Sequence, residues 1–389
     1  MPHRPLSDQV FVITGASSGI GLLTARKAAG AGARVFLISR NDAALRAIVQ
    51  EIEADGGRAA YAVADVGDRE ALQRAASCAI AAFGRVDTWV SNAGVAIYAP
   101  LLATPLEEHE RLFRTNYFGA VNSAQVAVPY LTASGGALVT IGSIAGDMPS
   151  PVMGAYTASK HAIHAFVASL RIELKAARSP VRVTLIKPSG MTTPIAMHAA
   201  NHQDGQARIP PPPYDPALVA DAILYTATHN VRALTVGGIG RLEVLFASHF
   251  PALFERLAPL VGPFLVDRSK PATQGDNLFG PGADGEARSR NEEGRRSSLT
   301  LAARTRPHAA AALVGGAAVI LGGLFLRNRR SWGNHGATGG IIEQSRAPAR
   351  DRELPWPPFP NPRPLATSNL SISASPSTAN GRRSRSCLG

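Results

Sequence analysis

The sequence predicts a doubly wound α/β fold built on a parallel sheet of seven strands. Between Gln9 and about Gly240, short apolar runs rich in β-branched residues alternate with segments of helical period. The runs are apolar almost without interruption, which is typical of strands covered by helices on both faces of a parallel sheet. With 389 residues, the chain has room for one large domain or two ordinary ones.

The predicted elements follow one another in strand–helix order. The strands are VFVIT (10–14), RVFLIS (34–39), AYAVA (60–64), VDTWVS (86–91), ALVTIG (137–142), VRVTLI (181–186) and ALTVG (233–237). Helices are expected at 19–30, 42–54, 68–83, 107–132, 154–177 and 216–229. Strand–helix–strand units at this spacing give parallel strands, so we expect residues 1–266 to form one domain.

Two segments of this domain depart from the alternation. Residues 190–214 carry four consecutive prolines and no clean period, and a loop of this length usually forms a functional lid or is disordered. Residues 241–266 are apolar nearly all round and contain three prolines. They predict broken helices packed on the edge of the domain, with a pocket wall, a dimer face or a membrane-dipping surface as alternatives.

The rest of the chain has a different composition. Residues 267–308 are rich in Gly, Pro, Ser, Asn and Arg, which predicts a linker. The 18 uncharged residues 309–326 lie between arginines and just reach the length of a spanning helix. They are a candidate membrane anchor, with a small docking helix as the alternative, and residues 327–389 are expected to be a disordered basic tail.

Charge and cysteine content exclude several classes of function. Of the formal net charge of +12, residues 251–389 contribute +9, with 19 basic and 10 acidic side chains. A basic tail without a groove-reading motif does not predict nucleic-acid binding. Cys78 and Cys387 form no metal or disulfide pattern, so we expect no metal and a reducing compartment. No secretory signal precedes the first strand, which favours a cytoplasmic catalytic domain, with or without the anchor.

The first predicted strand leads into a glycine-rich turn, TGASSGIG (14–21). Glycines at 15, 19 and 21 permit a tight turn in which main-chain N–H groups and a helix N-terminus approach a phosphate. The letters 15–19 also match the G-x-S-x-G elbow of serine hydrolases. That alternative needs an acid and a histidine on later strand ends, whereas His109, His161 and His164 fall in helical segments, and His198 and His202 fall in the loop 190–214.

The end of the second strand bears on the choice of nucleotide. An acidic residue there would bind the ribose 2′-hydroxyl of NAD. The chain has Ser39 and Arg40 instead, and a guanidinium suits a 2′-phosphate that a carboxylate would repel. We therefore expect NADP(H) to be preferred over NAD(H).

With the glycine-rich turn, SNAG (91–94) and Tyr156-x-x-x-Lys160 in this order, residues 7–240 resemble the short-chain dehydrogenase/reductase family. The resemblance implies a Rossmann-type domain in which ADV (64–66) and KPSGMTTP (187–194) also contact the nucleotide. In the latter segment Ser189 replaces the family's usual glycine. The implied cofactor contacts are Thr14, Gly15, Ser17, Ser18, Gly19, Ile20, Gly21, Ser39, Arg40, Asp65, Val66, Asn92, Ala93, Gly94, Tyr156, Lys160, Pro188 and Thr193.

The resemblance also implies a catalytic set of Asn116, Ser143, Tyr156 and Lys160. A free phenol has a pKa of about 10. Lys160, one helical turn away, and the positive nicotinamide of the oxidised cofactor would lower that pKa, so that Tyr156 can act as general acid or base. Ser143 would hold the substrate oxygen, and Asn116 would support a water that relays protons to Lys160.

The sequence therefore predicts an oxidoreductase that interconverts a carbonyl and an alcohol. A catalytically silent NADP(H)-binding regulatory or scaffold protein is the alternative, and the serine hydrolase a remote one. The substrate walls are expected from segments 95–103, 147–154, 190–214 and 241–266, whose apolar composition favours a lipophilic ketone or alcohol. A homo-oligomer formed through helices 107–132 and 154–177 would follow the resembling family.

Overall fold

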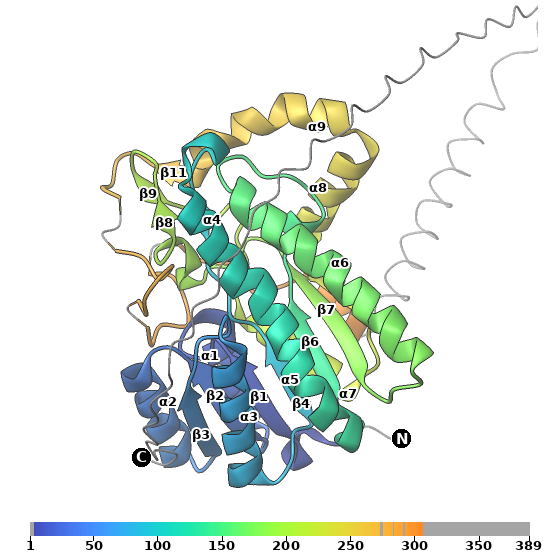
Figure 1. Ribbon diagram of the computed structural model, residues 1–389. Helices are drawn as coiled ribbons and strands as arrows, with labels where there is room; N and C mark the ends of the chain where they lie inside the picture. Colours follow the sequence, from blue (N-terminus) through green and yellow to red (C-terminus); the bar gives the residue numbers. More distant parts are fainter. Residues whose placement is uncertain (1–3, 273–274, 283, 291, 306–389) are drawn as a thin grey trace, which may run out of the picture. The chain divides into compact units, whose positions relative to one another are not determined.

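The computed structural model describes residues 4–272, 275–282, 284–290 and 292–305 (Figure 1). Within these residues, seven strands form one sheet in the order β10-β7-β6-β4-β1-β2-β3, and all of its neighbouring strands are parallel. The predicted doubly wound fold is confirmed. The candidate anchor 309–326 and the tail 327–389 lie outside the described residues.

The elements lie close to their expected ranges. The strands of the sheet are β1 (Val10–Thr14), β2 (Arg34–Ser39), β3 (Arg58–Val63), β4 (Thr88–Ser91), β6 (Ala137–Ile141), β7 (Arg182–Pro188) and β10 (Ala233–Val236). The helices of the predicted alternation are α1 (Gly19–Gly30), α2 (Asp42–Ala54), α3 (Arg69–Phe83), α4 (Leu106–Phe113), α5 (Gly119–Ser134), α6 (Gly154–Ala176) and α7 (Ala217–Thr228). The single helix expected at 107–132 is instead divided into α4 and α5 by a π-helical turn, η3 (Arg114–Phe118).

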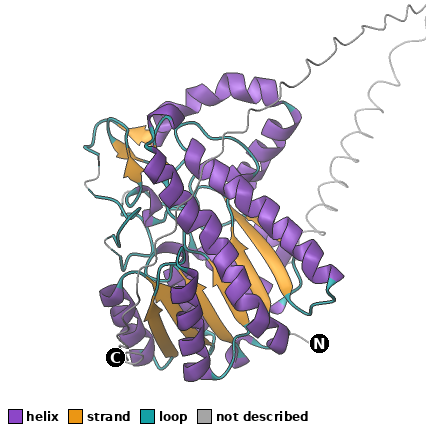
Figure 2. Cartoon of the chain, in the orientation of Figure 1, coloured by secondary structure: helices purple, strands orange, loops and turns teal. Residues whose placement is uncertain are grey.

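Helices cover both faces of the sheet, as Figures 1 and 2 show. Helices α1, α2 and α7 pack on one face, and α3, α5 and α6 pack on the other. Successive side chains of β1 alternate between the two cores: Phe11 and Ile13 belong to the first, and Val12 belongs to the second with Trp89 of β4. Both faces are therefore dry, which explains why the strands are continuous apolar runs.

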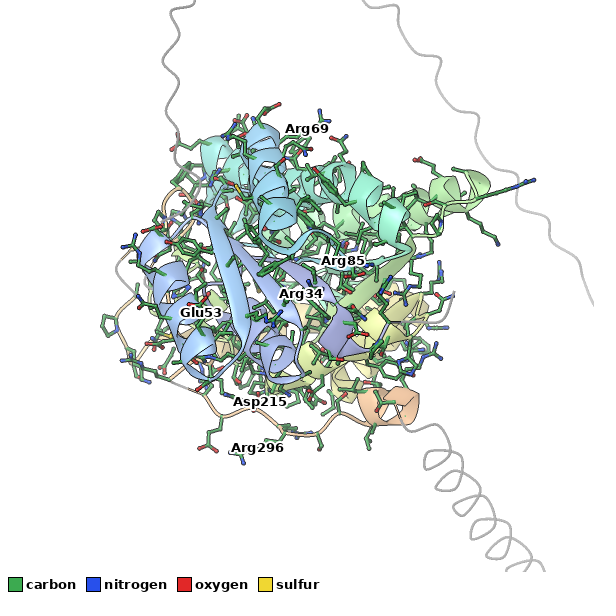
Figure 3. All side chains as sticks on the ribbon, turned by 90° about the horizontal axis from the view of Figure 1, so that it is seen from below. Arg34, Glu53, Arg69, Arg85, Asp215 and Arg296 are labelled. Carbon is green, nitrogen blue, oxygen red and sulfur yellow. The ribbon has the colours of Figure 1, made fainter. Side chains whose placement is uncertain are left out.

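The direction of strand order reverses between β1 and β4. Chain connections diverge at this point and leave a crevice beyond the carboxyl ends of the two strands, where ligands bind in such sheets. The amino ends of the strands, on the side of the sheet that Figure 3 shows, are stabilised by an ion pair and a hydrogen bond. There Arg85 pairs with Asp87 at 2.5 Å, and Asp87 accepts a hydrogen bond from the Val10 N–H at 3.0 Å.

The loop 190–214 is built into the fold through short strands. It contains η5 (Pro194–Ala196), β8 (Ala200–Asn201) and β9 (Gln206–Ala207). Strand β8 pairs with β5 (Ile97–Tyr98), and β9 pairs with β11 (Val266–Asp267). The loop is thus tied both to the segment after β4 and to the end of the apolar segment.

The apolar segment forms broken helices, as predicted. Helix α8 (Gly238–His249) is followed by α9 (Pro251–Leu257) and the 3₁₀ turns η6 (Ala258–Leu265). Among the described helices, none is alone both long and apolar enough to cross a bilayer. Only α8 taken together with residues Pro251–Leu265 reaches that length, across a bend of 118°. The expected membrane anchor therefore gains no support from the part of the chain that is described.

The described residues after Asp267 pack on the domain, although their composition predicts a linker at 267–308. Leu278 is 1% exposed, and Leu301 of α10 (Leu299–Thr305) is 6% exposed and belongs to the core under α1 and α7. Main-chain hydrogen bonds to the domain and these two leucines hold the segment, so a continuous apolar pattern is not required.

Candidate active site

The turn after β1 is fastened to the end of β4. Asn92 Nδ2 donates to the carbonyls of Thr14 at 3.0 Å and Gly15 at 3.1 Å, and Thr14 Oγ1 accepts from the Asn92 N–H at 3.0 Å. Gly15 has φ +63°, and a Cβ on Gly21 would lie 2.1 Å from the Gly15 carbonyl oxygen. Only glycine fits at these positions, and the result is a fixed cradle at the N-terminus of α1, where phosphates are commonly bound.

The ends of β2 and β3 supply a cation and an anion. Arg40 donates to the main-chain oxygens of Asn277 and, at 3.3 Å, of Leu278. Burial lowers the pKa of the Arg40 guanidinium, and the negative charge of Asp65 opposes this effect. Burial alone would raise the pKa of Asp65, but the hydrogen bond from Arg111, 2.6 Å long, helps to hold it below its ordinary value. Asp65 is therefore an anion at neutral pH.

Asn116 lies in the π-helical turn η3 and is 2% exposed. Its side-chain oxygen accepts from the Val95 N–H at 2.8 Å, and its nitrogen donates to the Val95 carbonyl at 3.0 Å and to Ser159 Oγ at 3.0 Å. Asn116 thus joins η3, the segment after β4, and α6. It fixes the main chain beside Gly94, whose α-carbon faces Lys160.

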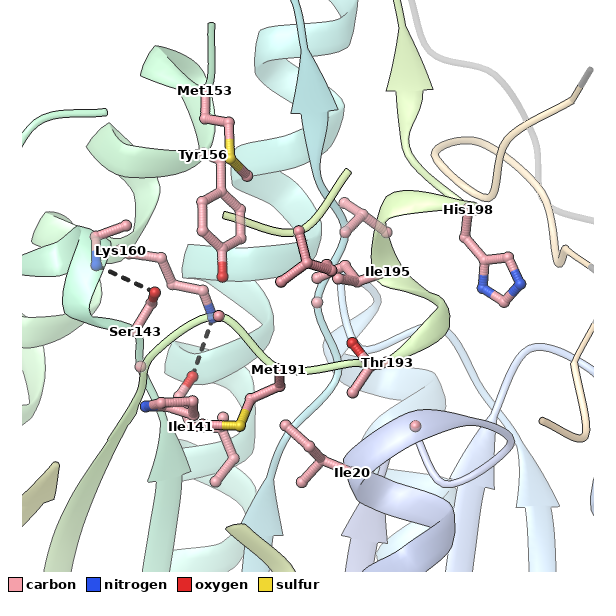
Figure 4. Close-up of a pocket in the computed structure, with 18 of the residues that line it drawn as sticks. Ile20, Ile141, Ser143, Met153, Tyr156, Lys160, Met191, Thr193, Ile195 and His198 are labelled. Atoms are coloured by element: carbon pink, nitrogen blue, oxygen red, sulfur yellow. Dashed lines mark hydrogen bonds between the residues drawn. The ribbon is translucent and has the colours of Figure 1, made fainter. Parts of the chain in front are cut away.

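Ser143, Tyr156 and Lys160 converge at the end of β6 and the start of α6 (Figure 4). Ser143 lies just after β6, and its hydroxyl accepts from the Ala145 N–H at 3.1 Å. The buried Lys160 donates to the Ile141 carbonyl at 3.0 Å, and its Nζ lies 5.5 Å from the centre of the Tyr156 ring. The predicted stacking of phenol and ammonium one helical turn apart is therefore present.

Burial sets the charge of this pair. It raises the pKa of Tyr156 to about 12, although the hydrogen bond with Ser143 acts in the opposite direction. Burial also lowers the pKa of Lys160 to about 8. Both shifts favour the neutral forms, because a charge loses its hydration when it is buried.

The segment after β7 accommodates Ser189 in place of the family's glycine. Ser189 N–H donates to the Val236 carbonyl at 2.9 Å, and its side chain packs on Gly237 and Gly240. A Cβ on Gly240 would lie 2.4 Å from Ser189 Oγ, so the glycines after β10 make room for the extra side chain. Pro188 and Thr193 keep their expected places, with Thr193 packed over Gly19.

These residues surround one cavity of about 480 Å³. The predicted residues in its lining are Gly15, Ser17, Ser18, Gly19, Ile20, Ser39, Arg40, Asp65, Val66, Asn92, Ala93, Gly94, Ser143, Tyr156, Lys160, Pro188 and Thr193. Thr14, Gly21 and Asn116 are not in the lining and support it from behind. The cavity therefore runs from the glycine-rich turn to the catalytic-type residues.

The predicted substrate segments also reach the cavity. Tyr98, Met153 and Ile209 line it from segments 95–103, 147–154 and 190–214. The fourth segment, 241–266, contributes the apolar side chains Phe246, Phe254, Leu257, Val261 and Leu265. Glu243 of α8 lies among the latter, and burial raises the pKa of its carboxyl.

Sequence reasoning missed the contribution of the segment after Asp267. Asn277, Pro281, Gly282 and Asp284 all line the cavity. Their surroundings in the sequence carry only the composition of a linker, and no motif or period distinguishes them. The signal that existed was a pair of large apolar residues, Leu278 and Phe279, in an otherwise polar or small-residue stretch.

The arrangement lacks the pair that a serine hydrolase needs. Within the described part of the chain, neither Ser17 nor Ser18 forms a hydrogen bond to a histidine. Gly19 has φ +55°, and its N–H donates to a main-chain oxygen instead. The described residues therefore show no Ser–His pair at the G-x-S-x-G letters.

Comparison with known proteins supports the same interpretation. The model of the short chain dehydrogenase family matches residues 9–204. The uncharacterized oxidoreductase YxnA of Bacillus subtilis (strain 168) is 38% identical over 319 residues, which is 80% of this chain and 90% of that protein. A match of this length includes the segment that follows Asp267.

Two solved structures share the fold. An alcohol dehydrogenase from the archaeon Thermococcus sibiricus, complexed with 5-hydroxy-NADP, has a TM-score of 0.52 and 25% identity, covering 59% of this chain and 95% of its own. A metagenomic short-chain oxidoreductase in complex with NADP has a TM-score of 0.50 and 32% identity, covering 60% and 97%. This chain belongs to the short chain dehydrogenase family and is an oxidoreductase that acts on CH–OH or C=O groups.

Proposed function

We propose that this enzyme interconverts a carbonyl and an alcohol with NADP(H), using Tyr156 as the general acid and base. The observation that carries the proposal is the convergence of Ser143, Tyr156 and Lys160 at one end of a cavity whose other end is the glycine-rich turn. The choice of nucleotide is supported by the two similar structures, one of which is complexed with 5-hydroxy-NADP and the other with NADP.

The residues present fit a nicotinamide nucleotide. Gly94 lines the cavity beside Lys160 and has no side chain to occupy it. Lys160 uses one hydrogen bond on Ile141, and an ammonium has three donors, which leaves capacity for ribose hydroxyls. When bound, the nucleotide supplies or accepts the hydride, and the protein supplies position and charge.

In the reducing direction, Tyr156 donates its proton to the carbonyl oxygen of the substrate as that oxygen gains charge. Ser143 donates a hydrogen bond to the same oxygen and holds it beside the phenol. Lys160 stabilises the phenolate that remains, because its ammonium lies on the ring. In the oxidising direction the phenolate takes the proton from the alcohol.

The walls favour a lipophilic substrate. Side chains of α8, α9 and η6 contribute phenylalanine, leucine and valine to the side of the cavity beyond Tyr156. A ketone or alcohol with an apolar body would bury its surface there. Oxidation of NADPH by the full chain with aldehydes, small ketones and lipid-like ketones tests the reaction and ranks the substrates.

The first prediction concerns the proton donor. Tyr156→Phe removes the proposed proton donor to the reacting oxygen while keeping the ring, so kcat should fall by at least about 10²-fold. The dissociation constant for NADPH, measured by fluorescence titration, should stay within about twofold. Tyr130→Phe is the matched control, because among the described residues the Tyr130 hydroxyl accepts a hydrogen bond from an exposed glutamine, Gln73.

Two results would contradict this assignment. Equal loss of turnover and NADPH binding would mean that the phenol is structural. A wild-type chain that binds NADPH but reduces no carbonyl in the panel would favour the regulatory or scaffold alternative.

The second prediction concerns the nucleotide. Arg40→Asp replaces a guanidinium by a carboxylate at the end of β2, so the affinity for NADPH should fall by about 10²-fold and the ratio of NADPH to NADH affinity should invert. Titration of both nucleotides measures it. Arg46→Asp makes the same change of charge at an exposed position of α2 and should leave the ratio unchanged. An unaltered ratio in Arg40→Asp would refute the role of this arginine.

A further inference from the structure

The segment after Asp267 crosses the nucleotide end of the cavity. Its described residues 276–282 and 284–290, here called the strap, run beside β8 and above α2 as the orange segment of Figure 1. The Gly285 N–H donates to the Ser17 carbonyl at 2.9 Å, and the Gly19 N–H donates to the Glu286 carbonyl at 2.9 Å. The strap is thus paired with the glycine-rich turn through the main chain of both.

The strap is also bound to the end of β2. The Arg40 guanidinium donates to the carbonyls of Asn277 and Leu278, and Asn41 Nδ2 donates to the Gly282 carbonyl at 3.2 Å. The residue that is expected to recognise a 2′-phosphate therefore also holds the strap. An arginine has five donors, so two bonds to the strap leave others for a phosphate.

One side chain anchors the strap in the core. Leu278 is 1% exposed and packs in a cluster with Val95, Ile97 and Leu112. The Asn277 N–H donates to the His198 carbonyl at 2.9 Å, and Arg111 Nε donates to the Leu278 carbonyl at 2.8 Å. The anchor closes the space between the segment after β4 and the loop 190–214.

The strap completes the wall of the cavity rather than filling it. Asn277, Pro281, Gly282 and Asp284 face the same cavity as Ser17 and Arg40. The Asp284 carboxylate forms no hydrogen bond or ion pair with the described residues, and its charge acts on the Arg40 guanidinium. A carboxylate thus lies at the adenosine end of the site, contributed from outside the segment that matches the family model.

We propose that the strap is part of the nucleotide site, where its anchor Leu278 limits the exchange of the nucleotide and Asp284 weakens the binding of a 2′-phosphate. This inference rests on the proposed function, since it assumes that the cavity binds NADP(H). A nucleotide held under the strap leaves only when the bonds to Ser17, Gly19 and Arg40 open. Loss of the anchor makes that opening easier.

The first test measures the release of NADPH from the full chain by stopped-flow displacement with excess NADP⁺. Leu278→Ala should accelerate release by at least about fivefold, because truncating a buried leucine weakens its packing substantially. Leu299→Ala is the matched control, because Leu299 lies on the same extension but is 82% exposed. It should release NADPH at the wild-type rate.

The second test uses a surface variant that preserves shape. Asp284→Asn removes one negative charge at the adenosine end, so the affinity for NADPH should rise by about fivefold while that for NADH stays within about twofold. Glu293→Gln removes the same charge from an exposed position of the extension that does not line the cavity, and neither affinity should change.

The outcomes separate this inference from the proposed function. A wild-type chain that binds neither nucleotide would refute the proposed function itself. The wild type could bind NADPH while Leu278→Ala releases it at the wild-type rate and Asp284→Asn keeps both affinities. That result would overturn the inference about the strap and leave the proposed function standing. If Leu278→Ala does not fold, the affinity ratio in Asp284→Asn decides, because that substitution removes no buried contact.

Discussion

Burial acts on Tyr156 and Lys160 in opposite directions, and in each case it favours the neutral side chain. The pKa of the phenol is raised to about 12, and that of the ammonium is lowered to about 8. The spacing of the two residues predicts that Lys160 makes the phenol more acidic, yet in the protein alone desolvation is the largest influence on the phenol, and the hydrogen bond with Ser143 is what opposes it. In the proposed reaction, the oxidised nicotinamide would add a positive charge that lowers the pKa of Tyr156 toward neutral pH.

This balance predicts how the pH dependence responds to the loss of Lys160. In the proposed mechanism, alcohol oxidation requires the phenolate of Tyr156, so its rate should rise with pH through the pKa of that residue. Lys160→Met removes the cation on the ring, raises that pKa further, and should move the rising limb of log kcat to higher pH by about one unit or more. The pH profile of NADP⁺ reduction with an active alcohol measures the shift.

The control for this variant is Lys175→Met, at the exposed end of the same helix. It removes an equal charge far from the phenol and should leave the profile in place. A Lys160→Met enzyme with reduced kcat but an unshifted profile would show that Lys160 positions the substrate or nucleotide without affecting the acidity of Tyr156.

The predicted site residues share one property, which is that each lies in a short motif whose spacing is fixed by the element that carries it. Tyr156 and Lys160 are one helical turn apart, and Gly15, Gly19 and Gly21 define one turn. Asp284, in contrast, belongs to no motif that the sequence reveals. Its place at the cavity depends on contacts with residues more than 200 positions away, which no local pattern encodes.

At the scale of elements, the division of the helix expected at 107–132 is the main departure. The apolar period continues across α4 and α5, so the sequence gives no sign of a break. The structure inserts the π-helical turn η3 at Arg114–Phe118. Turns of this kind are rare and are frequently found at functional sites. Here the turn carries Asn116, whose amide is bound to the main chain of Val95.

The Asn116 side chain forms three hydrogen bonds, two to Val95 and one to Ser159, and these connect η3, the segment after β4 and α6. We therefore expect that replacing Asn116 lowers the stability of the whole domain. Asn116→Ala leaves the buried N–H and carbonyl of Val95 without their partner. The free energy of unfolding should fall by about 2 kcal/mol. Urea denaturation measures the change, and kcat should fall with it because the chain beside Gly94 loses its support.

An exposed amide provides the comparison. Gln73→Ala removes a hydrogen bond to Tyr130 on the surface and should change the free energy of unfolding by less than about 0.5 kcal/mol. If Asn116→Ala were equally mild, the contacts of η3 would not stabilise the fold, and the turn would have to be explained by catalysis alone.

At the scale of the molecule, the sheet and most of its helices could be predicted because the central strands are apolar on both faces and the helical segments alternate with them at regular spacing. The extension could not be predicted in the same way. Composition averages over a segment, whereas the extension is held by main-chain hydrogen bonds and by two buried leucines, Leu278 and Leu301, with 22 residues between them. Such contacts form only in the folded chain between residues far apart in the sequence, so no local pattern predicts them.

The integration of the extension into the domain is itself testable. Leu301 of α10 is 6% exposed and packs into the core under α1 and α7, whereas Leu299, two residues earlier, is 82% exposed. Leu301→Ala should lower the free energy of unfolding of the full chain by about 2 kcal/mol, with an unchanged dependence on urea concentration. Leu299→Ala should have almost no effect. Equal midpoints for both variants would mean that α10 unfolds independently of the sheet, and the extension would then be the linker that its composition predicts.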